Sequence, residues 1–464
     1  MGRIALTASL LVASTAHAGV VNVTTVNELT TAITNAKPGD EILLANGTYA
    51  LTGISCSANG TAAQPIVVRA PTPLGAHIEL DALEGFRVTG ANWHFEGLDI
   101  TGVCANDSDC EHAFHVSGAA HGFVLRFSRV MNFNAQLKVN AGLIGSTYVT
   151  PNNGLIEYNE LGDSHGRDTA NPVTKLNIDT GEDWVVRGNY LHDAYKLQGD
   201  GTSYAAFMKS GSKRGLFERN LVVCSHVTTG GTRIGLSFGG GGTGAQYCAP
   251  AFDPNVPCSV EHDGGTMRNN IIANCSDVGI YLNRAKDSHV LFNTLIGTTG
   301  VDFRFDTTSG EAVGNLLTSM IRTRDGAALS ESGNQMNVAT SQFAAWYRAP
   351  LDGDLAIIGD VTALIGSAPM RTDVKNDYCA ALRPSGALTM GALEHSVMPQ
   401  CDTTFPPTGV VDPTGDGALG GDAGTSGGGG GGGCCQAPGR PDALPVVLVL
   451  LVLGWRRRFV TRSA

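Results

Sequence analysis

A short phrase recurs between Gly154 and Leu317, and this repeat limits the chain to few folds. The phrase is two or three apolar residues, a polar pair, an asparagine and further apolar residues, as in LIEYNEL and VVRGNYL. Steps of 30, 31, 50, 23 and 22 residues separate the asparagines. Such a period predicts a stacked array, because one unit cannot bury its own apolar face. The asparagines are Asn159, Asn189, Asn220, Asn270, Asn293 and Asn315, preceded in two weaker copies by Gly97 and Ser128.

Each repeat has the pattern of β-strands, since its apolar runs are short, β-branched and separated by Gly, Asn, Asp and Ser. About 22 residues suffice for three short strands and three turns, which make one coil of a parallel β-helix. The steps near 30 predict the same coil with a longer loop. The step of 50 predicts two coils, the second containing Arg233 to Gly242. Asparagines at one corner of successive coils can bond to each other, so we expect a structural asparagine ladder.

The N-terminal segment from Val20 to Tyr49 predicts a cap over the first coil. We expect Asn27 to cap a short amphipathic helix with Leu29, Ala32 and Ile33 on one face. The wording AKPGDEILLANGTY is typical of β-helix proteins that act on polysaccharides. From Val20 to Glu394 the chain resembles the right-handed parallel β-helix superfamily. The resemblance implies an all-β solenoid, a right-handed parallel β-helix over residues 19–396 with a short N-terminal capping helix.

The two ends of the chain have different compositions. Residues 1–18 predict a signal peptide, with Arg3, an apolar run and an Ala-His-Ala cleavage site. Residues 397–435 predict a Pro/Gly-rich linker. Residues 436–464 contain an apolar run of about 12 residues followed by three consecutive arginines, and a full membrane span needs about 20 apolar residues.

The end of the linker and the tail after it combine a Gly-Cys-Cys sequence, an apolar run and an arginine cluster. This arrangement resembles the C-terminal sorting tail of myxobacterial surface proteins, which implies processing near Cys434 or Cys435. A plain stop-transfer anchor is the alternative. Either interpretation predicts a secreted protein held at the cell surface or outer membrane, with membrane contact only through the tail.

The cysteines fit an oxidising compartment, since there are 11 in the chain. Close spacing suggests three disulfides, and similar offsets from the repeat asparagines suggest a fourth between coils. Cys56 is left over, and no Cys/His spacing suggests zinc, so we predict no metal and no cofactor. The predicted pairs are Cys104–Cys110, Cys248–Cys258, Cys379–Cys401 and Cys224–Cys275.

The formal net charge of −11 argues against nucleic acid as a partner. It also means that an acidic polymer would need a local basic patch. We expect a monomer whose partner is extracellular polysaccharide. The longest loops fall in the central coils, and this predicts a binding face on one side of the solenoid.

Cleavage of a uronate polymer by β-elimination makes three demands: a neutralised carboxylate, a base beside it and a proton for the leaving oxygen. Lys209-Ser210-Gly211 resembles the K-S-G strand of the alginate lyase and chondroitinase B family, in which that lysine is the base. The chain departs from the family where two calcium-binding glutamates would fall, near Thr202 and Tyr204. The next coil also lacks the family's Arg-His-Gly-Asn strand.

The resemblance implies Lys209 as base, and we expect Arg233 or Lys175 to neutralise the carboxylate. Lys138, Lys175 and Arg304 occur at comparable points of neighbouring coils, and His226 follows a strand on the looped side. We therefore predict Lys209 and Arg233 as catalytic residues. The predicted substrate-binding residues are Lys175, Lys138, His226 and Arg304.

Two further function classes compete with this hypothesis. Hydrolysis by paired carboxylates would draw on Asp163, Asp168, Asp179, Asp183 and Asp200, but the polygalacturonase motifs are absent. A non-catalytic glycan-binding or adhesin-like surface rod is favoured by the missing glutamates and arginine strand. The sequence predicts a protein that binds extracellular acidic polysaccharide, and by the first hypothesis cleaves it.

Overall fold

The computed structural model describes residues 19–397 and 400–404. The predicted signal peptide, most of the predicted linker, Cys434, Cys435 and the predicted tail lie outside the described residues. No helix among the described residues is long and apolar enough to cross a membrane.

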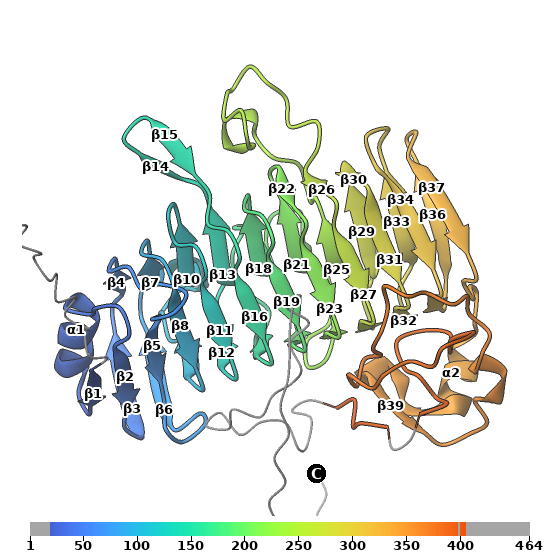
Figure 1. Ribbon diagram of the computed structural model, residues 1–464, viewed down its shortest axis with the longest axis horizontal. Coiled ribbons are helices and arrows are strands. Elements are labelled where there is room, and N and C mark those ends of the chain that lie inside the picture. Colours follow the sequence, from blue (N-terminus) through green and yellow to red (C-terminus); the bar gives the residue numbers. More distant parts are fainter. Residues whose placement is uncertain (1–18, 398–399, 405–464) are drawn as a thin grey trace, which may run out of the picture. The chain divides into compact units, whose positions relative to one another are not determined.

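Three long parallel sheets run the length of the repeat region (Figure 1). Sheet A has twelve described strands: β1 (Val20–Val23), β2 (Glu41–Leu44), β5 (Ile66–Arg69), β8 (Trp93–Glu96), β11 (Val124–Arg126), β16 (Leu155–Glu157), β19 (Val185–Arg187), β23 (Leu216–Glu218), β27 (Thr266–Arg268), β31 (Ser288–Leu291), β34 (Ser309–Val313) and β37 (Ala328–Ser332).

Sheet B has ten described strands: β3 (Gly47–Leu51), β6 (Ala76–Leu80), β9 (Asp99–Gly102), β12 (Arg129–Met131), β17 (Glu160–Gly162), β20 (Tyr190–His192), β24 (Leu221–Val223), β28 (Ile271–Ala273), β32 (Thr294–Ile296) and β35 (Leu316–Leu317). Sheet C also has ten: β4 (Ile54–Cys56), β7 (Glu84–Val88), β10 (His112–Ser117), β13 (Ala135–Asn140), β18 (Val173–Asp179), β21 (Thr202–Lys209), β25 (Thr232–Phe238), β29 (Ile280–Asn283), β33 (Gly300–Arg304) and β36 (Met320–Arg324).

Each coil contributes one strand to each sheet in the order A, B, C, and equivalent residues of successive coils pair in parallel. Leu155 lies opposite Val185, and Leu176 opposite Ala206. The inward side chains of all three sheets meet in one apolar core. The chain is therefore a right-handed parallel β-helix, as predicted.

The asparagine ladder is also confirmed. The backbone N–H and the side-chain amide of Asn159 both donate to Oδ1 of Asn189 at 3.0 Å. The same pattern continues through all six asparagines and on to Asn334. The six predicted members are at most 1% exposed, so their amides need these bonds to satisfy buried polar groups.

The prediction that the step of 50 residues contains two coils is wrong. The backbone N–H of Asn220 donates directly to Oδ1 of Asn270 at 3.0 Å, so these two asparagines lie in adjacent coils. The segment assigned to an extra coil contains β25, which is the sheet C strand of the same coil. A long loop between β25 and β26 (His262–Asp263) supplies the remaining length.

The predicted capping helix is present as α1 (Val26–Thr34), with Leu29 and Ile33 buried. Its N-cap is Thr25, not Asn27 as expected. The hydroxyl of Thr25 accepts from the backbone of Glu28, and the carboxylate of Glu28 accepts from the backbone of Thr25. This reciprocal pair is a capping box, which satisfies two N–H groups at the helix start.

A second core covers part of the outer face of sheet B. The C-terminal segment contains α2 (Thr340–Trp346), β38 (Tyr347–Ala349) and β39 (Asp354–Ile357), drawn in orange in Figure 1. Phe343 and Trp346 pack in one cluster with Leu221 and Leu316 of sheet B. Within the described residues, this second core does not extend over the outer face of sheet C, which carries the polar side chains described below.

All four predicted disulfides are present. Cys224–Cys275 joins neighbouring coils, and Cys104–Cys110, Cys248–Cys258 and Cys379–Cys401 close shorter loops. Cys56 is free and buried, and the predicted pairing had also left it without a partner.

We expect acid to destabilise the fold through buried neutral histidines such as His262. His262 stacks on Phe238 at 4.1 Å, shares a hydrogen bond with Ser212 and accepts from Gly215. Burial lowers the pKa of His262 from 6.5 to about 3. Because the folded pKa is depressed, the stabilisation is complete above pH 6.5 and is lost as pH falls toward 3.

Two pH units below the unfolded pKa, the expected loss for such a group is about 2–3 kcal/mol. Thermal melts between pH 7 and 4.5 measure it, with His262→Gln expected to flatten the decline in melting temperature. His226→Gln is the control, since its ring is exposed. An unchanged pH slope in His262→Gln would contradict the assignment.

Candidate functional site

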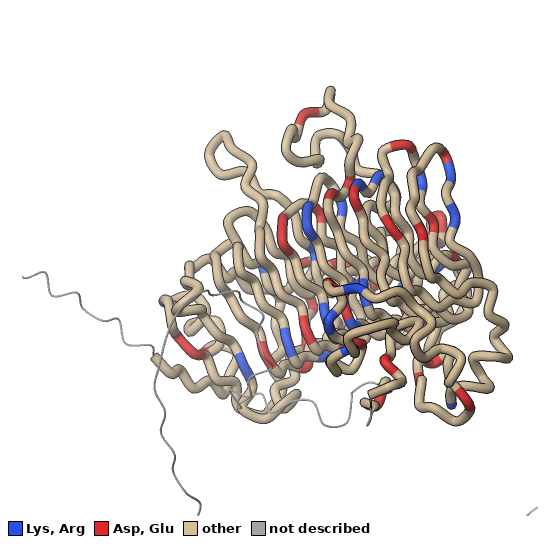
Figure 2. Tube along the Cα trace, turned by 45° about the vertical axis from the view of Figure 1, so that its right-hand side comes forward, with Lys and Arg blue, Asp and Glu red and all other residues tan. Residues whose placement is uncertain are grey.

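Charged residues recur along neighbouring coils of the solenoid (Figure 2), and several of them lie on strands of sheet C. Strand register places Asp179 of β18 directly opposite Lys209 of β21. In the later coils it places Arg304 of β33 opposite Arg324 of β36. Residues paired in this way lie about 4.8 Å apart along the stack, so their charges act on one another.

Lys209 is held at the end of β21 by three contacts. Its Nζ lies 3.7 Å from Oδ1 of Asp179 and 3.5 Å from the carbonyl oxygen of Gly242. It also lies 4.8 Å from the centre of the Phe207 ring. Lys138 donates to the same Asp179 carboxylate and to Oδ1 of Asn177 at 3.0 Å. One carboxylate therefore joins two lysines, and both side chains keep some exposure.

A cleft of about 430 Å³ lies beside Lys209 on the same face. Gly242, whose carbonyl oxygen Lys209 contacts, lines one part of the cleft together with Gly241. The remainder is lined by the starts of β21 and β25, by residues of β29, β33 and β36, and by Asp200 and Asp277. Arg304 bonds Asp325 at 2.7 Å and the hydroxyl of Tyr281 at 3.3 Å, and Arg324 pairs with Asp302. The cleft thus offers guanidinium groups, carboxylates and aromatic rings to a polar, partly charged ligand.

A run of four glycines keeps the approach to Lys209 open. Met208 pairs with Phe238, so Gly239 is the neighbour of Lys209 in the next coil. The φ of Gly239 is +73°, which favours glycine. A Cβ on Gly239 would lie 1.9 Å from the carbonyl oxygen of Asn283. A Cβ on Gly241 or Gly242 would meet nothing within 4 Å. Side chains are therefore missing where the cleft meets Lys209.

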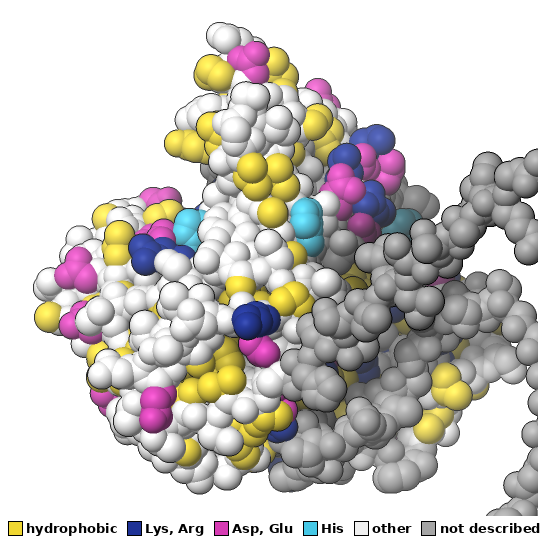
Figure 3. Space-filling view, turned by 60° about the vertical axis from the view of Figure 1, so that its left-hand side comes forward, with side chains coloured by type: hydrophobic (Ala, Val, Ile, Leu, Met, Phe, Trp, Pro, Cys, Tyr) yellow, Lys and Arg dark blue, Asp and Glu magenta, His cyan; other side chains and the backbone are white. Residues whose placement is uncertain are grey.

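Two long loops leave the same edge of sheet C (Figure 1). One is the hairpin of β14 (Gly142–Ile144) and β15 (Thr147–Val149) after β13, and the other follows β25. Tyr148 of the hairpin stacks on Phe252 of the second loop at 4.4 Å. Because β18 and β21 lie between these loops in the sheet, the stacked rings connect the loops that flank Lys209. Figure 3 shows hydrophobic side chains on the projecting part of the surface.

Lys175 and Arg233 do not share this face. Lys175 is fully buried, bonds Asp163 and donates to the carbonyl of Phe133 at 3.2 Å. Burial lowers its pKa and raises that of Asp163. Arg233 is 1% exposed, stacks on Tyr195 at 4.4 Å and donates to backbone carbonyls of its own loop. The expected cleft of Lys209, Lys175 and Arg233 is not formed, because loops between sheets B and C cover the last two.

His226 lies in an exposed loop that follows sheet B. Its backbone N–H donates to Asp193, and its ring meets His192 edge-on at 6.0 Å. Although burial opposes it, hydrogen bonds from His192 and Thr228 lower the pKa of Asp193 to about 2. His226 therefore belongs to a loop corner and is not brought to Lys209 by these contacts.

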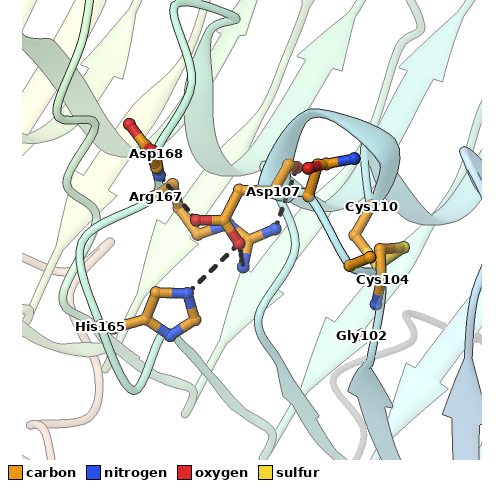
Figure 4. A pocket seen from close by; sticks show the side chains of 9 residues that line it. Gly102, Cys104, Asp107, Cys110, His165, Arg167 and Asp168 are labelled. Carbon is orange, nitrogen blue, oxygen red and sulfur yellow. Dashed lines mark hydrogen bonds and ion pairs between the residues drawn. A yellow bond between two sulfur atoms is a disulfide. The ribbon is translucent and has the colours of Figure 1, made fainter.

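A smaller cavity of about 350 Å³ lies at the Cys104–Cys110 loop (Figure 4). Asp107 bonds Arg167 at 2.7 Å, His165 at 3.2 Å and the backbone N–H of Asp168 at 2.6 Å. Burial opposes these bonds, yet they hold the pKa of Asp107 below its usual range. Since the polar groups satisfy each other, the cluster ties two loops together.

The five aspartates of the hydrolase alternative are all engaged in this structure. Asp163 and Asp179 bond lysines, as described above. The others have partners of their own: Asp168 accepts from Gln198, Asp183 from Arg214, and Asp200 from Lys196. This pairing does not favour a general acid and base working as two free carboxylates.

Sequence reasoning missed a cluster on the N-terminal part of sheet C. One ligand-type atom from each of Glu84, His112 and His115 lies within 4.8 Å of the other two. Glu84 belongs to β7 and the histidines to β10, the neighbouring strand. The signal that could have found them is His-Ala-Phe-His at 112–115, placed beside an acidic residue one coil earlier.

Comparisons with known proteins agree with the architecture. The family model of chondroitinase B matches residues 23–98, which cover the capping helix and first coils and not Lys209. The crystal structure of pectate lyase Pel9A is similar with a TM-score of 0.52 at 14% identity, covering 82% of this chain and 97% of that one. A rhamnogalacturonan lyase structure has a TM-score of 0.49 at 16% identity, covering 75% and 92%. No curated protein matches the chain. At 14% identity, the similarity to Pel9A shows that the two proteins share the parallel β-helix fold.

Proposed function

We propose that the outer face of sheet C binds an extracellular acidic polysaccharide and cleaves it by β-elimination, with Lys209 as the base. The observation that supports this most is the position of Lys209 beside a cleft that contains Arg304, Arg324 and Tyr281. The match to the chondroitinase B family model and the similarity to a pectate lyase also support an acidic polysaccharide as the substrate. Four disulfides support a location outside the reducing cytosol.

In this proposal Lys209 first gives up its ammonium proton, and its amine then removes the proton on the carbon beside a uronate carboxylate. The electron pair of that C–H bond forms a carbon–carbon double bond, and the neighbouring C–O bond breaks. The leaving oxygen takes a proton, which completes the balance. Arg304 and Lys138 bind carboxylates of the polymer, because both carry positive charge on the same face.

In this proposal Tyr281 donates that proton to the leaving oxygen. Its hydroxyl oxygen accepts from Asn283 at 3.2 Å and from Arg304 at 3.3 Å. Both partners are donors, so the hydroxyl hydrogen of Tyr281 is left to donate to a ligand oxygen in the cleft.

The second candidate is a non-catalytic glycan-binding rod at the cell surface. It is favoured by the ion pairs of the face, since Asp179, Asp302 and Asp325 already neutralise its basic groups. Anchoring through residues 436–464 is part of either proposal.

Incubation with alginate, pectate and chondroitin separates the two candidates. The lyase proposal expects rising ultraviolet absorbance from an unsaturated product with one polymer. Binding without absorbance would support the non-catalytic rod, and the absence of both would overturn the assignment of this face to acidic polysaccharide.

A further inference from the structure

Three side chains on the outer face of sheet C form a set of donors that no part of the proposed elimination uses. Glu84 and His115 are partly exposed, at 31% and 23% of their side chains. His112 lies beside them, with its ring 5.5 Å from that of His115. Their ligand-type atoms come within 4.8 Å of one another.

His112 has an unsatisfied polar atom. Its Nδ1 is buried and has no hydrogen-bond partner among the described residues. A buried polar atom without a partner costs about 1–3 kcal/mol, so a native structure rarely leaves one unused. A cation held between His112 and its neighbours would give this lone pair a partner.

His115 is oriented as metal-binding histidines are. The side-chain amide of Asn140 donates to the carbonyl of Ala141 at 2.7 Å, which turns Oδ1 of Asn140 toward His115. Nε2 of His115 lies 2.5 Å from that oxygen and donates to it. Nδ1 is thereby aimed at the carboxylate of Glu84, 2.7 Å away. A hydrogen bond from the second ring nitrogen to an amide or carbonyl oxygen is the usual support of a ligating histidine.

We propose that Glu84, His112 and His115 form a binding site for one divalent transition-metal ion of the zinc type. A tetrahedral ion with bonds of about 2.0–2.2 Å holds its ligand atoms about 3.3 Å apart, so small rotations of the exposed side chains complete the site. Three protein ligands leave a coordination position for water or a ligand oxygen.

The donors and their surroundings select the class of ion. Two imidazole nitrogens and one carboxylate suit zinc and its neighbours, whereas calcium prefers six to eight oxygen ligands. Arg87 and Lys138 are the register neighbours of His115 on either side. Their positive charges oppose every cation, and bonds to two imidazole nitrogens compensate a zinc-type ion for this repulsion better than they compensate calcium.

The site is distinct from Lys209. Two strands, β13 and β18, lie between β10 and β21, which is about 14 Å at ~4.8 Å per strand. Metal binding at Glu84, His112 and His115 can therefore be tested independently of the proposed elimination at Lys209.

The test is a titration of the untagged, chelator-treated protein with Zn²⁺ by calorimetry, and with Co²⁺ by visible absorbance. We expect one ion per chain at this site and a raised melting temperature on addition of Zn²⁺. His112→Gln, His115→Gln and Glu84→Gln are expected to weaken binding by about 100-fold, and Asn140→Leu by about 10-fold.

The matched control is His289→Gln. His289 of β31 lies 2.7 Å from Glu311 of β34, so it repeats the histidine and carboxylate pair, and no second histidine of the described residues joins them. This variant is expected to bind Zn²⁺ as the parent does. Melting curves in chelator show whether each variant is folded. Zn²⁺ affinity that is unchanged in both folded His112→Gln and folded His115→Gln, or no binding by the parent, would overturn the proposal.

Discussion

Replacing Lys209 by arginine is expected to remove cleavage and to leave polymer binding intact. Arginine keeps the positive charge beside Asp179 but cannot act as a base near neutral pH, because its guanidinium stays protonated. Removal of a general base costs about 10²–10⁴-fold in turnover. The measurement is the initial rate of ultraviolet absorbance with the polymer that the parent cleaves, together with its dissociation constant.

Lys213→Arg is the control for this experiment. Lys213 lies four residues further along in β22 (Ser212–Lys213), is 42% exposed and pairs with Glu182 at 3.1 Å. The Lys213→Arg variant is expected to cleave the polymer at the parental rate. Parental turnover in Lys209→Arg would remove Lys209 as base, even if the protein is a lyase. A fall in affinity with turnover unchanged would assign Lys209 to binding alone.

The fold could be predicted from the sequence because the repeat phrase marks the same corner of each coil. A buried asparagine must bond to the asparagines of the coils above and below it. The repeat of Asn159 and Asn189 therefore indicates adjacent coils from the sequence alone. The count of coils failed between Asn220 and Asn270. Sequence spacing alone does not distinguish an extra coil from a long loop, and β25 carries no asparagine phrase of its own.

Strand register predicts which candidate residues lie on one sheet face, but it does not predict which of them are covered by loops. Lys138 and Arg304 lie on the same sheet face as Lys209, since each occupies an outward position of a stacked strand. Lys175 and Arg233 also lie on sheet C, but the loops that precede their strands fold over them. Burial of that kind depends on how irregular loops pack, and no periodic pattern encodes it.

Exchanging Lys175 for methionine is expected to destabilise the protein by about 3–5 kcal/mol, because it leaves the carboxylate of Asp163 buried without its cation. Both side chains are fully buried, so water cannot replace the lost partner. The measurement is the midpoint of thermal unfolding, followed by the affinity of the folded variant for polymer. If Lys175 is structural, the midpoint falls and the affinity does not change.

Lys138→Met is the contrasting variant, since Lys138 is 18% exposed and shares Asp179 with Lys209. It should cost less stability than Lys175→Met, because both partners keep some exposure and Lys209 remains beside Asp179, and it should weaken polymer binding. The double exchange Lys175→Met with Asp163→Leu should recover most of the lost stability, because removing both charges leaves neither one unpaired. A double variant as unstable as Lys175→Met alone would show that the loss comes from packing. Weakened polymer affinity in a folded Lys175→Met protein would instead restore the substrate-binding role that the sequence predicted for this lysine.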